Sequence, residues 1–130
     1  MELYLRKRHG KIVHIADSIF RSNYYFICTP KHSDFVRIVK ENFKFDVEDH
    51  NSAEGECLFV ETEDNNICIL WTSSMKPHIV AHEVFHAVAE LFRMMRIPLT
   101  EDTEEVYALY QQYLLGACLC PERKKKKNQT

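Results

Sequence analysis

The sequence predicts a single α+β domain, on the basis of two segment patterns and the length of the chain. Short stretches rich in aromatic and β-branched residues dominate the first part, and longer amphipathic helical patterns dominate the last part. The chain has 130 residues, 45% of them hydrophobic and 12% aromatic, which suffices for one core and not for two ordinary domains. We therefore expect residues 1–120 to form one domain around a twisted, mostly antiparallel sheet with helices packed against it.

Five segments have the composition of β-strands. The stretches ELYL (2–5), KIVHIA (11–16) and NYYFICT (23–29) carry the aromatic and β-branched residues favoured in strands. Further along, ECLFVET (56–62) and ICILWT (67–72) are separated by a short turn-like segment rich in Asp and Asn, which tolerate left-handed conformations. These last two segments are therefore predicted to form a β-hairpin.

Helices are predicted at 34–44, 77–96 and 103–118, where apolar residues recur at helical spacing. Ser33 is the expected N-cap of the first helix, and Pro77 suits the first turn of the second. The apolar stripes expected to face the core are Val84, Phe85, Val88, Leu91, Phe92 and Met95 on the second helix, and Val106, Leu109, Tyr110, Tyr113 and Leu114 on the third.

The charge is distributed unevenly along the chain. The formal net charge is −2, and RKKKK at 123–127 supplies five of the 17 Lys and Arg residues, so the rest of the chain is acidic. We expect 121–130 to be a basic, disordered tail. Because no aromatic residues separate its charges, the tail favours a solubilising terminus over nucleic-acid binding. No window has the length needed to cross a membrane, so no membrane partner is expected.

Cysteine usage favours a reducing compartment. The cysteines are odd in number, scattered, and contain no CxxC pair, which argues against a disulfide framework and against a zinc ribbon. They are Cys28, Cys57, Cys68, Cys118 and Cys120. We therefore expect a cytoplasmic protein.

The stretch AHEVFHAVAEL at 81–91 contains the motif HExxH on the second predicted helix. His82 and His86 are separated by about 40° around the helix axis and one turn along it, so both imidazoles project from one face and can bind one metal ion. Glu83 lies about 100° from His82, where its carboxylate could reach a metal-bound water more easily than the metal. The histidines also lie off the apolar stripe, which favours a metal site over two core histidines.

A catalytic zinc needs a third protein ligand, and the acidic cluster EDTEE at 101–105 is the best placed source. With the expected apolar stripe on the third helix, Glu105 falls at its border and Glu104 faces roughly the opposite way. Asp102 ranks second because it lies in or before the first turn. The alternative role for such a carboxylate is a favourable interaction with the helix dipole.

The segments ILWT, AHEVFHAV and TEEVYALYQQYLLG together resemble the gluzincin group of zinc metallopeptidases, in particular small HExxH proteins of tailed phages and prophages. The resemblance covers 67–117 and implies a minimal zincin-like fold. It implies zinc held by His82, His86 and Glu105, because the third ligand of larger gluzincins is a glutamate about twenty positions after the second histidine. Larger gluzincins often carry an aspartate one turn later, where this chain has Leu109.

The resemblance implies hydrolysis of peptide bonds through a metal-activated water, with Glu83 as general base. It implies a peptide or protein substrate bound as an added strand along 67–72, and a bacterial host cytoplasm if the protein is phage-derived. Tyr107, Tyr110 or His78 could stabilise the oxyanion, and the sequence does not choose among them. Two alternatives stay open: a non-catalytic zinc-containing binding module, in which a fourth ligand such as His78 closes the site, and a zinc hydrolase acting on a non-peptide amide.

Overall fold

Four strands form one mixed sheet in the order β1-β2-β4-β3 in the computed structural model, which describes residues 12–50, 53–61 and 66–120. β1 (Ile12–Asp17) pairs antiparallel with β2 (Ser22–Cys28), and β3 (Gly55–Glu61) pairs antiparallel with β4 (Asn66–Thr72). The central pair, β2 and β4, is parallel. The α+β class and the hairpin at β3 and β4 are therefore confirmed, whereas the predicted strand 2–5 and the tail 121–130 lie outside the described residues.

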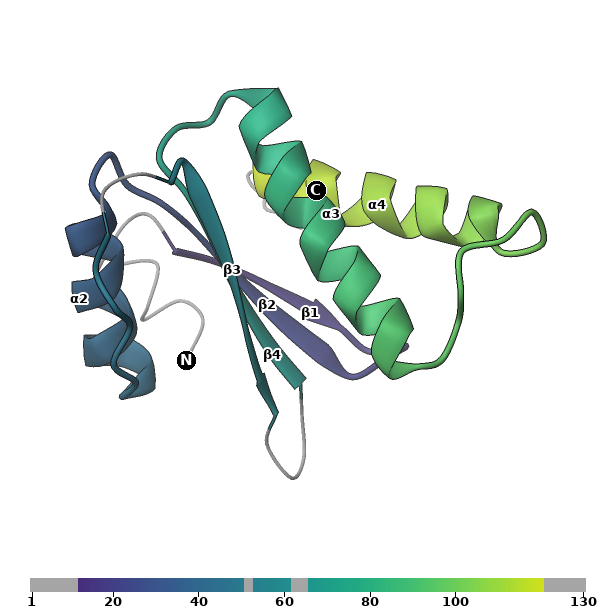
Figure 1. Cartoon of the computed structure of the whole chain (residues 1–130), viewed down its shortest axis with the longest axis horizontal. Helices are drawn as coiled ribbons and strands as arrows, with labels where there is room; N and C mark the ends of the chain where they lie inside the picture. The colour runs from purple at the N-terminus through teal and green to yellow at the C-terminus, as the bar shows by residue number, and fades with distance from the viewer. Residues whose placement is uncertain (1–11, 51–52, 62–65, 121–130) are drawn as a thin grey trace, which may run out of the picture.

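The sheet lies between two helical layers, as Figure 1 shows. α2 (His32–Phe43) covers one face, and α3 (Pro77–Met94) and α4 (Glu104–Leu119) cover the other. The core on the α2 side consists of Ile12, Ile27, Phe35, Ile38, Val39, Ile69 and Trp71. The larger core on the other side joins alternate residues of the strands to α3 and α4 and includes Phe26, Leu70, Val84, Val88, Phe92 and Leu114. The alternation of strand side chains thus gives each helical layer its own buried surface.

The pairing corrects one sequence-based prediction. β4 is hydrogen-bonded to β2 on one side and to β3 on the other, so the segment 67–72 has no free edge that could accept a substrate strand. The sequence could not show this, because hairpin formation does not reveal which of its two strands enters the middle of a sheet. Among the described residues the outer strands are β1 and β3, and β3 is the one that packs beside α3.

The helix bounds agree with the sequence to within a few residues, and Val84, Val88, Leu91 and Phe92 of the predicted α3 stripe are buried, but other parts of the predicted stripes are exposed. Phe85 on α3 is 47% exposed. On α4, Leu109 is 56% exposed, while Leu114 and Cys118 are buried. α4 carries apolar residues on several sides, so helical spacing alone misplaced the centre of its buried side. No helix in the described ranges is both long and apolar enough to cross a bilayer.

Hydrogen bonds of two tyrosines fix α4 on the sheet, one of them Tyr110 of the predicted stripe and the other Tyr107, which lies outside that stripe. The Tyr110 hydroxyl donates to Asp17 Oδ2 at 2.6 Å and lies 2.9 Å from the Tyr24 hydroxyl. The Tyr107 hydroxyl donates to the Ile97 carbonyl at 2.6 Å. Burial raises the pKa of Tyr110 far above its usual range, so this hydroxyl stays protonated and remains a donor. These bonds connect α4 to β1, β2 and the end of α3.

Replacing Tyr110 tests this anchor. Tyr110→Phe leaves the buried Asp17 carboxylate without its tyrosine donor, and we expect a loss of about 1–3 kcal/mol in the free energy of unfolding. The matched control is Tyr113→Phe on the same helix, where the side chain is 40% exposed and the change should stay within about 0.5 kcal/mol. Chemical denaturation measures both, and equal losses would show that the Tyr110 hydroxyl contributes no more than an exposed one.

Candidate functional site

His82 and His86 lie on the exposed face of α3 and approach each other through their Nε2 atoms, which are 3.3 Å apart. Their rings are inclined at 72° with centroids 4.9 Å apart. Two nitrogen ligands bound tetrahedrally to one zinc ion at about 2.0–2.1 Å lie about 3.3–3.4 Å from each other. The two imidazoles therefore already have the separation that a shared zinc ion requires.

Glu83 occupies a different environment from the two histidines beside it. Its side chain is buried, at 7% exposure, and lies against the backbone of Gly55 in β3. A Cβ atom at position 55 would lie 2.5 Å from Glu83 Oε2, closer than real Cβ contacts occur. Gly55 is thus required for close approach of the carboxylate to the strand. This contact places Glu83 between α3 and β3.

The surroundings of Glu83 raise the pKa of its carboxyl group. Burial is the main cause, since it disfavours the charged form, and the nearby Glu56 carboxylate adds to the increase. His82 and His86 act in the opposite direction when they are charged. A carboxylate with a raised pKa accepts protons more readily, which suits a general base at neutral pH.

An open groove runs between α3 and β3, and Gly55, His82 and Glu83 line both of its halves. The half toward the N-terminus of α3 has a volume of about 330 Å³ and includes His78. The half toward the C-terminus has a volume of about 420 Å³ and includes Phe59 and Arg93. We call these two halves the α3–β3 groove, and a ligand lying in it would contact the HExxH motif at its middle.

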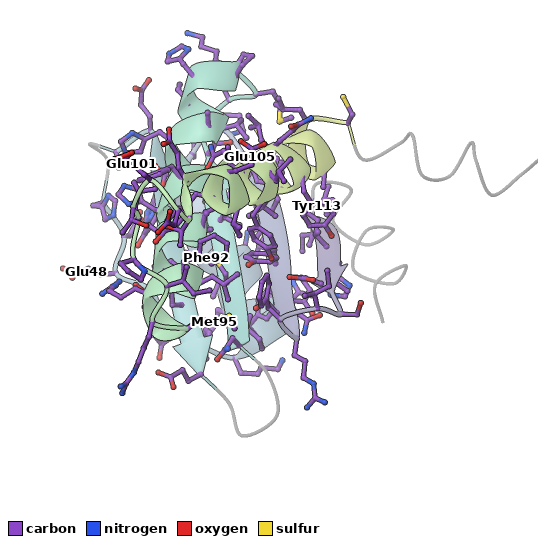
Figure 2. All side chains as sticks on the ribbon, turned by 90° about the vertical axis from the view of Figure 1, so that its right-hand side faces the viewer. Glu48, Phe92, Met95, Glu101, Glu105 and Tyr113 are labelled. Carbon is purple, nitrogen blue, oxygen red and sulfur yellow. The ribbon has the colours of Figure 1, made fainter. Side chains whose placement is uncertain are left out.

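The structure does not bring Glu105 to the two histidines. Glu105 is exposed on the first turn of α4, as Figure 2 shows. Within the described ranges, one group of three His, Cys, Asp or Glu side chains has all its ligand atoms within 4.8 Å of one another, and it contains none of His82, His86 and Glu105. Asp102, ranked second, is likewise exposed and precedes the helix.

The orientation of α4 also removes the reason for preferring Glu105 to Glu104. The Gln111 amide reaches the Ala81 carbonyl at 3.5 Å, so Gln111 marks the side of α4 that faces α3. Glu104 precedes Gln111 by seven residues and lies about 20° from it around the helix, whereas Glu105 lies about 120° away. The prediction from sequence relied on a buried stripe of Val106, Leu109, Tyr110, Tyr113 and Leu114, of which Leu114 is buried while Val106, Leu109 and Tyr113 are exposed.

The structure separates the three candidates for oxyanion stabilisation. The hydroxyls of Tyr107 and Tyr110 are engaged with Ile97 and Asp17, and neither side chain lines the α3–β3 groove. His78 is exposed and lines that groove together with His82 and Glu83. His78 is therefore the candidate whose position agrees with the role.

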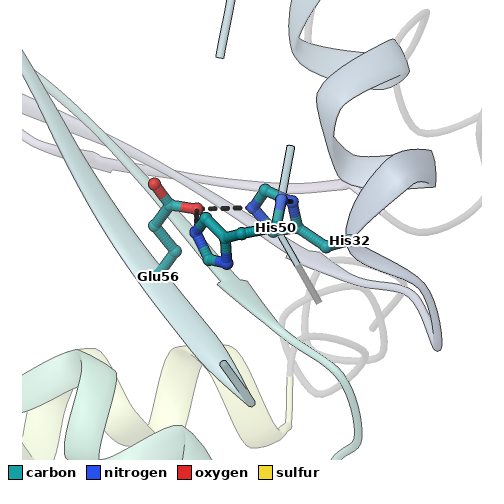
Figure 3. Close-up of side chains that lie close together, drawn as sticks. All are labelled: His32, His50 and Glu56. Atoms are coloured by element: carbon teal, nitrogen blue, oxygen red, sulfur yellow. Dashed lines mark hydrogen bonds and ion pairs between the residues drawn. The ribbon is translucent and has the colours of Figure 1, made fainter. Parts of the chain in front are cut away.

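Sequence reasoning missed a second cluster, formed by His32, His50 and Glu56 (Figure 3). These residues come from the start of α2, the segment after it, and β3. Their spacing of eighteen and six positions matches no metal motif, and they meet because the end of β4 pairs on one side with the end of β2, which leads to α2, and on the other side with the start of β3. No local signal in the sequence could have indicated this cluster.

Comparison of the chain with protein-family models, with curated proteins and with solved structures gives no match.

The contact between Gly55 and Glu83 gives a specific prediction. Gly55→Ala should displace the Glu83 carboxylate and lower the free energy of unfolding by about 1–3 kcal/mol, because the added methyl group overlaps it. In a Glu83→Ala background the same substitution should cost much less, since the overlapping atoms are gone. A double-mutant cycle by chemical denaturation measures this coupling. Equal costs in both backgrounds would contradict the contact.

Proposed function

We propose that the protein is a zinc-dependent metallopeptidase whose active site is the HExxH motif of α3. The observation that carries the proposal is the 3.3 Å separation of the His82 and His86 Nε2 atoms on an open helix face, with Glu83 buried beside them. The resemblance of the motif and its flanking segments to small gluzincins, including those of phages and prophages, supports the same reading.

His82 and His86 would hold the zinc ion, and an acidic side chain at the start of α4 would supply the third ligand. When bound, zinc acts as a Lewis acid that polarises the substrate carbonyl and makes water more acidic. Glu104 and Glu105 are the two helical carboxylates at that place. Either of them must come closer than the described arrangement shows, so we propose that the third ligand closes the site when metal is present.

Glu83 would act as the general base. Its carboxylate would take a proton from the attacking water and pass it to the leaving amine, and its raised pKa favours the first of these transfers. The tight packing against Gly55 limits the movement of the carboxylate, so the base is already positioned before substrate arrives. His78, at the end of the same groove, would stabilise the charge that develops on the substrate oxygen.

An extended peptide is the substrate class that fits the α3–β3 groove. β3 is an outer strand of the described sheet, and its residues Gly55, Cys57 and Phe59 line the groove beside the histidines. A peptide in the groove can pair with the outer edge of β3 while its backbone passes the HExxH motif. This location replaces the segment 67–72, whose strand is paired on both sides.

A non-catalytic binding module is the second candidate. Its support is that no carboxylate joins His82 and His86 in the described arrangement, so the catalytic set of three ligands is incomplete. In that function Glu83 has no proton to transfer, and a further ligand such as His78 would close the metal site.

Glu83→Gln separates the two functions. The amide keeps the size of the side chain and cannot act as a base, so zinc per chain should stay at the parental value while peptide cleavage falls by about 10²-fold or more. Elemental analysis and cleavage of a mixed peptide library measure the two effects. The matched control is Glu41→Gln on α2, across the sheet from α3, which should change neither. Undiminished cleavage by Glu83→Gln would show that Glu83 is not the base.

The third ligand is tested by Glu104→Gln and Glu105→Gln, each being the control of the other. The variant that removes the ligand should lose zinc affinity and activity together, because a neutral amide is a much weaker ligand than a carboxylate. The position of Gln111 on the α3 side of α4 favours Glu104, and the sequence resemblance favours Glu105. Zinc titration decides between them, and parental affinity in both variants would place the third ligand outside this turn.

A further inference from the structure

His32, His50 and Glu56 form a cluster of potential metal ligands on the face of the sheet opposite α3. Glu56 Oε1 lies 2.6 Å from His32 Nε2 and 3.4 Å from His50 Nε2. Ligand atoms of the three residues all lie within 4.8 Å of one another. Figure 3 shows both imidazoles directed at the same carboxylate oxygen. Two imidazole nitrogens from different segments of the chain therefore converge on one carboxylate oxygen.

The environment of His32 is that of a positioned ligand. Its side chain is only 2% exposed, and its ring contacts the rings of Phe35 and Trp71. The ring also stacks on His50, with centroids 4.1 Å apart. A buried imidazole packed against several rings has already lost its conformational entropy on folding. Metal binding therefore costs little further entropy at this side chain.

Asp49 supplies the support that metal-binding histidines commonly have. Its Oδ1 atom lies 3.0 Å from His32 Nδ1, and the same nitrogen accepts a hydrogen bond from the His50 backbone N–H at 3.2 Å. In that tautomer the Nε2–H donates to Glu56 Oε1, 2.6 Å away. An ion bound at Nε2 requires the other tautomer, in which Nδ1–H donates to Asp49. A carboxylate that orients an imidazole in this way raises its basicity toward a metal.

We propose that His32, His50 and Glu56 bind a second divalent ion of the zinc class, with Asp49 positioning His32. Two imidazoles and one carboxylate favour zinc-like ions over calcium or magnesium, which prefer sites made entirely of oxygen. The three ligands join the first residue of α2 to the segment after α2 and to β3. The proposal concerns residues separate from the HExxH motif and does not depend on the proposed function.

The site would stabilise the strand on which the HExxH groove is built. Glu56 directly follows Gly55, whose backbone supports the Glu83 carboxylate. A metal ion on Glu56 would hold β3 against α2 on one face while Glu83 packs on the other. We therefore expect zinc to raise the melting temperature even in the His82→Ala/His86→Ala variant.

Zinc stoichiometry in the full chain tests the proposal. The parent should bind two zinc ions, and the His82→Ala/His86→Ala variant should bind one. Glu56→Gln and His50→Ala should each lose the second ion and keep the one on α3. The control is Glu48→Gln, an exposed carboxylate next to Asp49 in the sequence, which should keep both. His50 and Glu56 are chosen because both are partly exposed, and circular dichroism establishes that their variants remain folded.

Cobalt as a spectroscopic probe extends the test to Asp49. In the His82→Ala/His86→Ala background, Co²⁺ should give visible absorption of a site with nitrogen ligands, and Asp49→Asn should weaken its binding about 10–100-fold without changing the stoichiometry.

Two results would overturn the proposal. One is a single zinc ion in the parent that both Glu56→Gln and His50→Ala retain, which would leave the HExxH site as the one metal site. The other is loss of all zinc in the His82→Ala/His86→Ala variant. A single ion that persists in the latter variant and is lost in Glu56→Gln would instead support the second site and contradict the proposed function.

Discussion

The packing of Glu83 on the Gly55 backbone is the contact on which the candidate site depends. It requires a glycine in β3, a helix close enough to press a carboxylate against the strand, and a hairpin that brings β3 to the side of α3. The same closeness removes Glu83 from water and raises its pKa. Burial disfavours the charged form of Glu83, and this lowers the stability of the fold at neutral pH. The same effect makes the carboxylate a stronger base.

The two faces of β3, an outer strand of the sheet, contribute to two different clusters. Gly55 and Cys57 face α3 and the HExxH motif, whereas Glu56, between them in the sequence, faces His32 and His50. The alternation of side chains in a strand therefore separates the clusters by the thickness of the sheet, while the backbone joins them. The two faces still interact, since the charge of Glu56 contributes to the raised pKa of Glu83. Any ion that neutralised Glu56 would weaken that contribution.

The sequence could predict those features of the site that depend on residues close together in the chain. The positions of His82 and His86 on one helix face follow from a spacing of four residues, and the separation of their Nε2 atoms agrees with it. Pro77 marked the start of α3 correctly. The order of the strands, the buried side of α4 and the cluster at His32 depend on tertiary contacts between distant segments. Helical spacing could not choose the buried side of α4, because apolar residues occur around most of that helix.

The ligands of the proposed zinc site also differ in what positions them, since some are placed by local geometry and one by tertiary contacts. Two of its proposed ligands, His82 and His86, lie one turn apart on a single helix, so their proximity has a local cause. The proposed third ligand belongs to α4, whose placement is set by hydrogen bonds of Tyr107 and Tyr110 to Ile97 and Asp17. Those bonds lie at the opposite side of α4 from Glu105, by the periodicity of the helix. A small rotation or shift of α4 would therefore alter the third ligand alone, and the affinity for zinc would depend on how firmly β1 holds this helix.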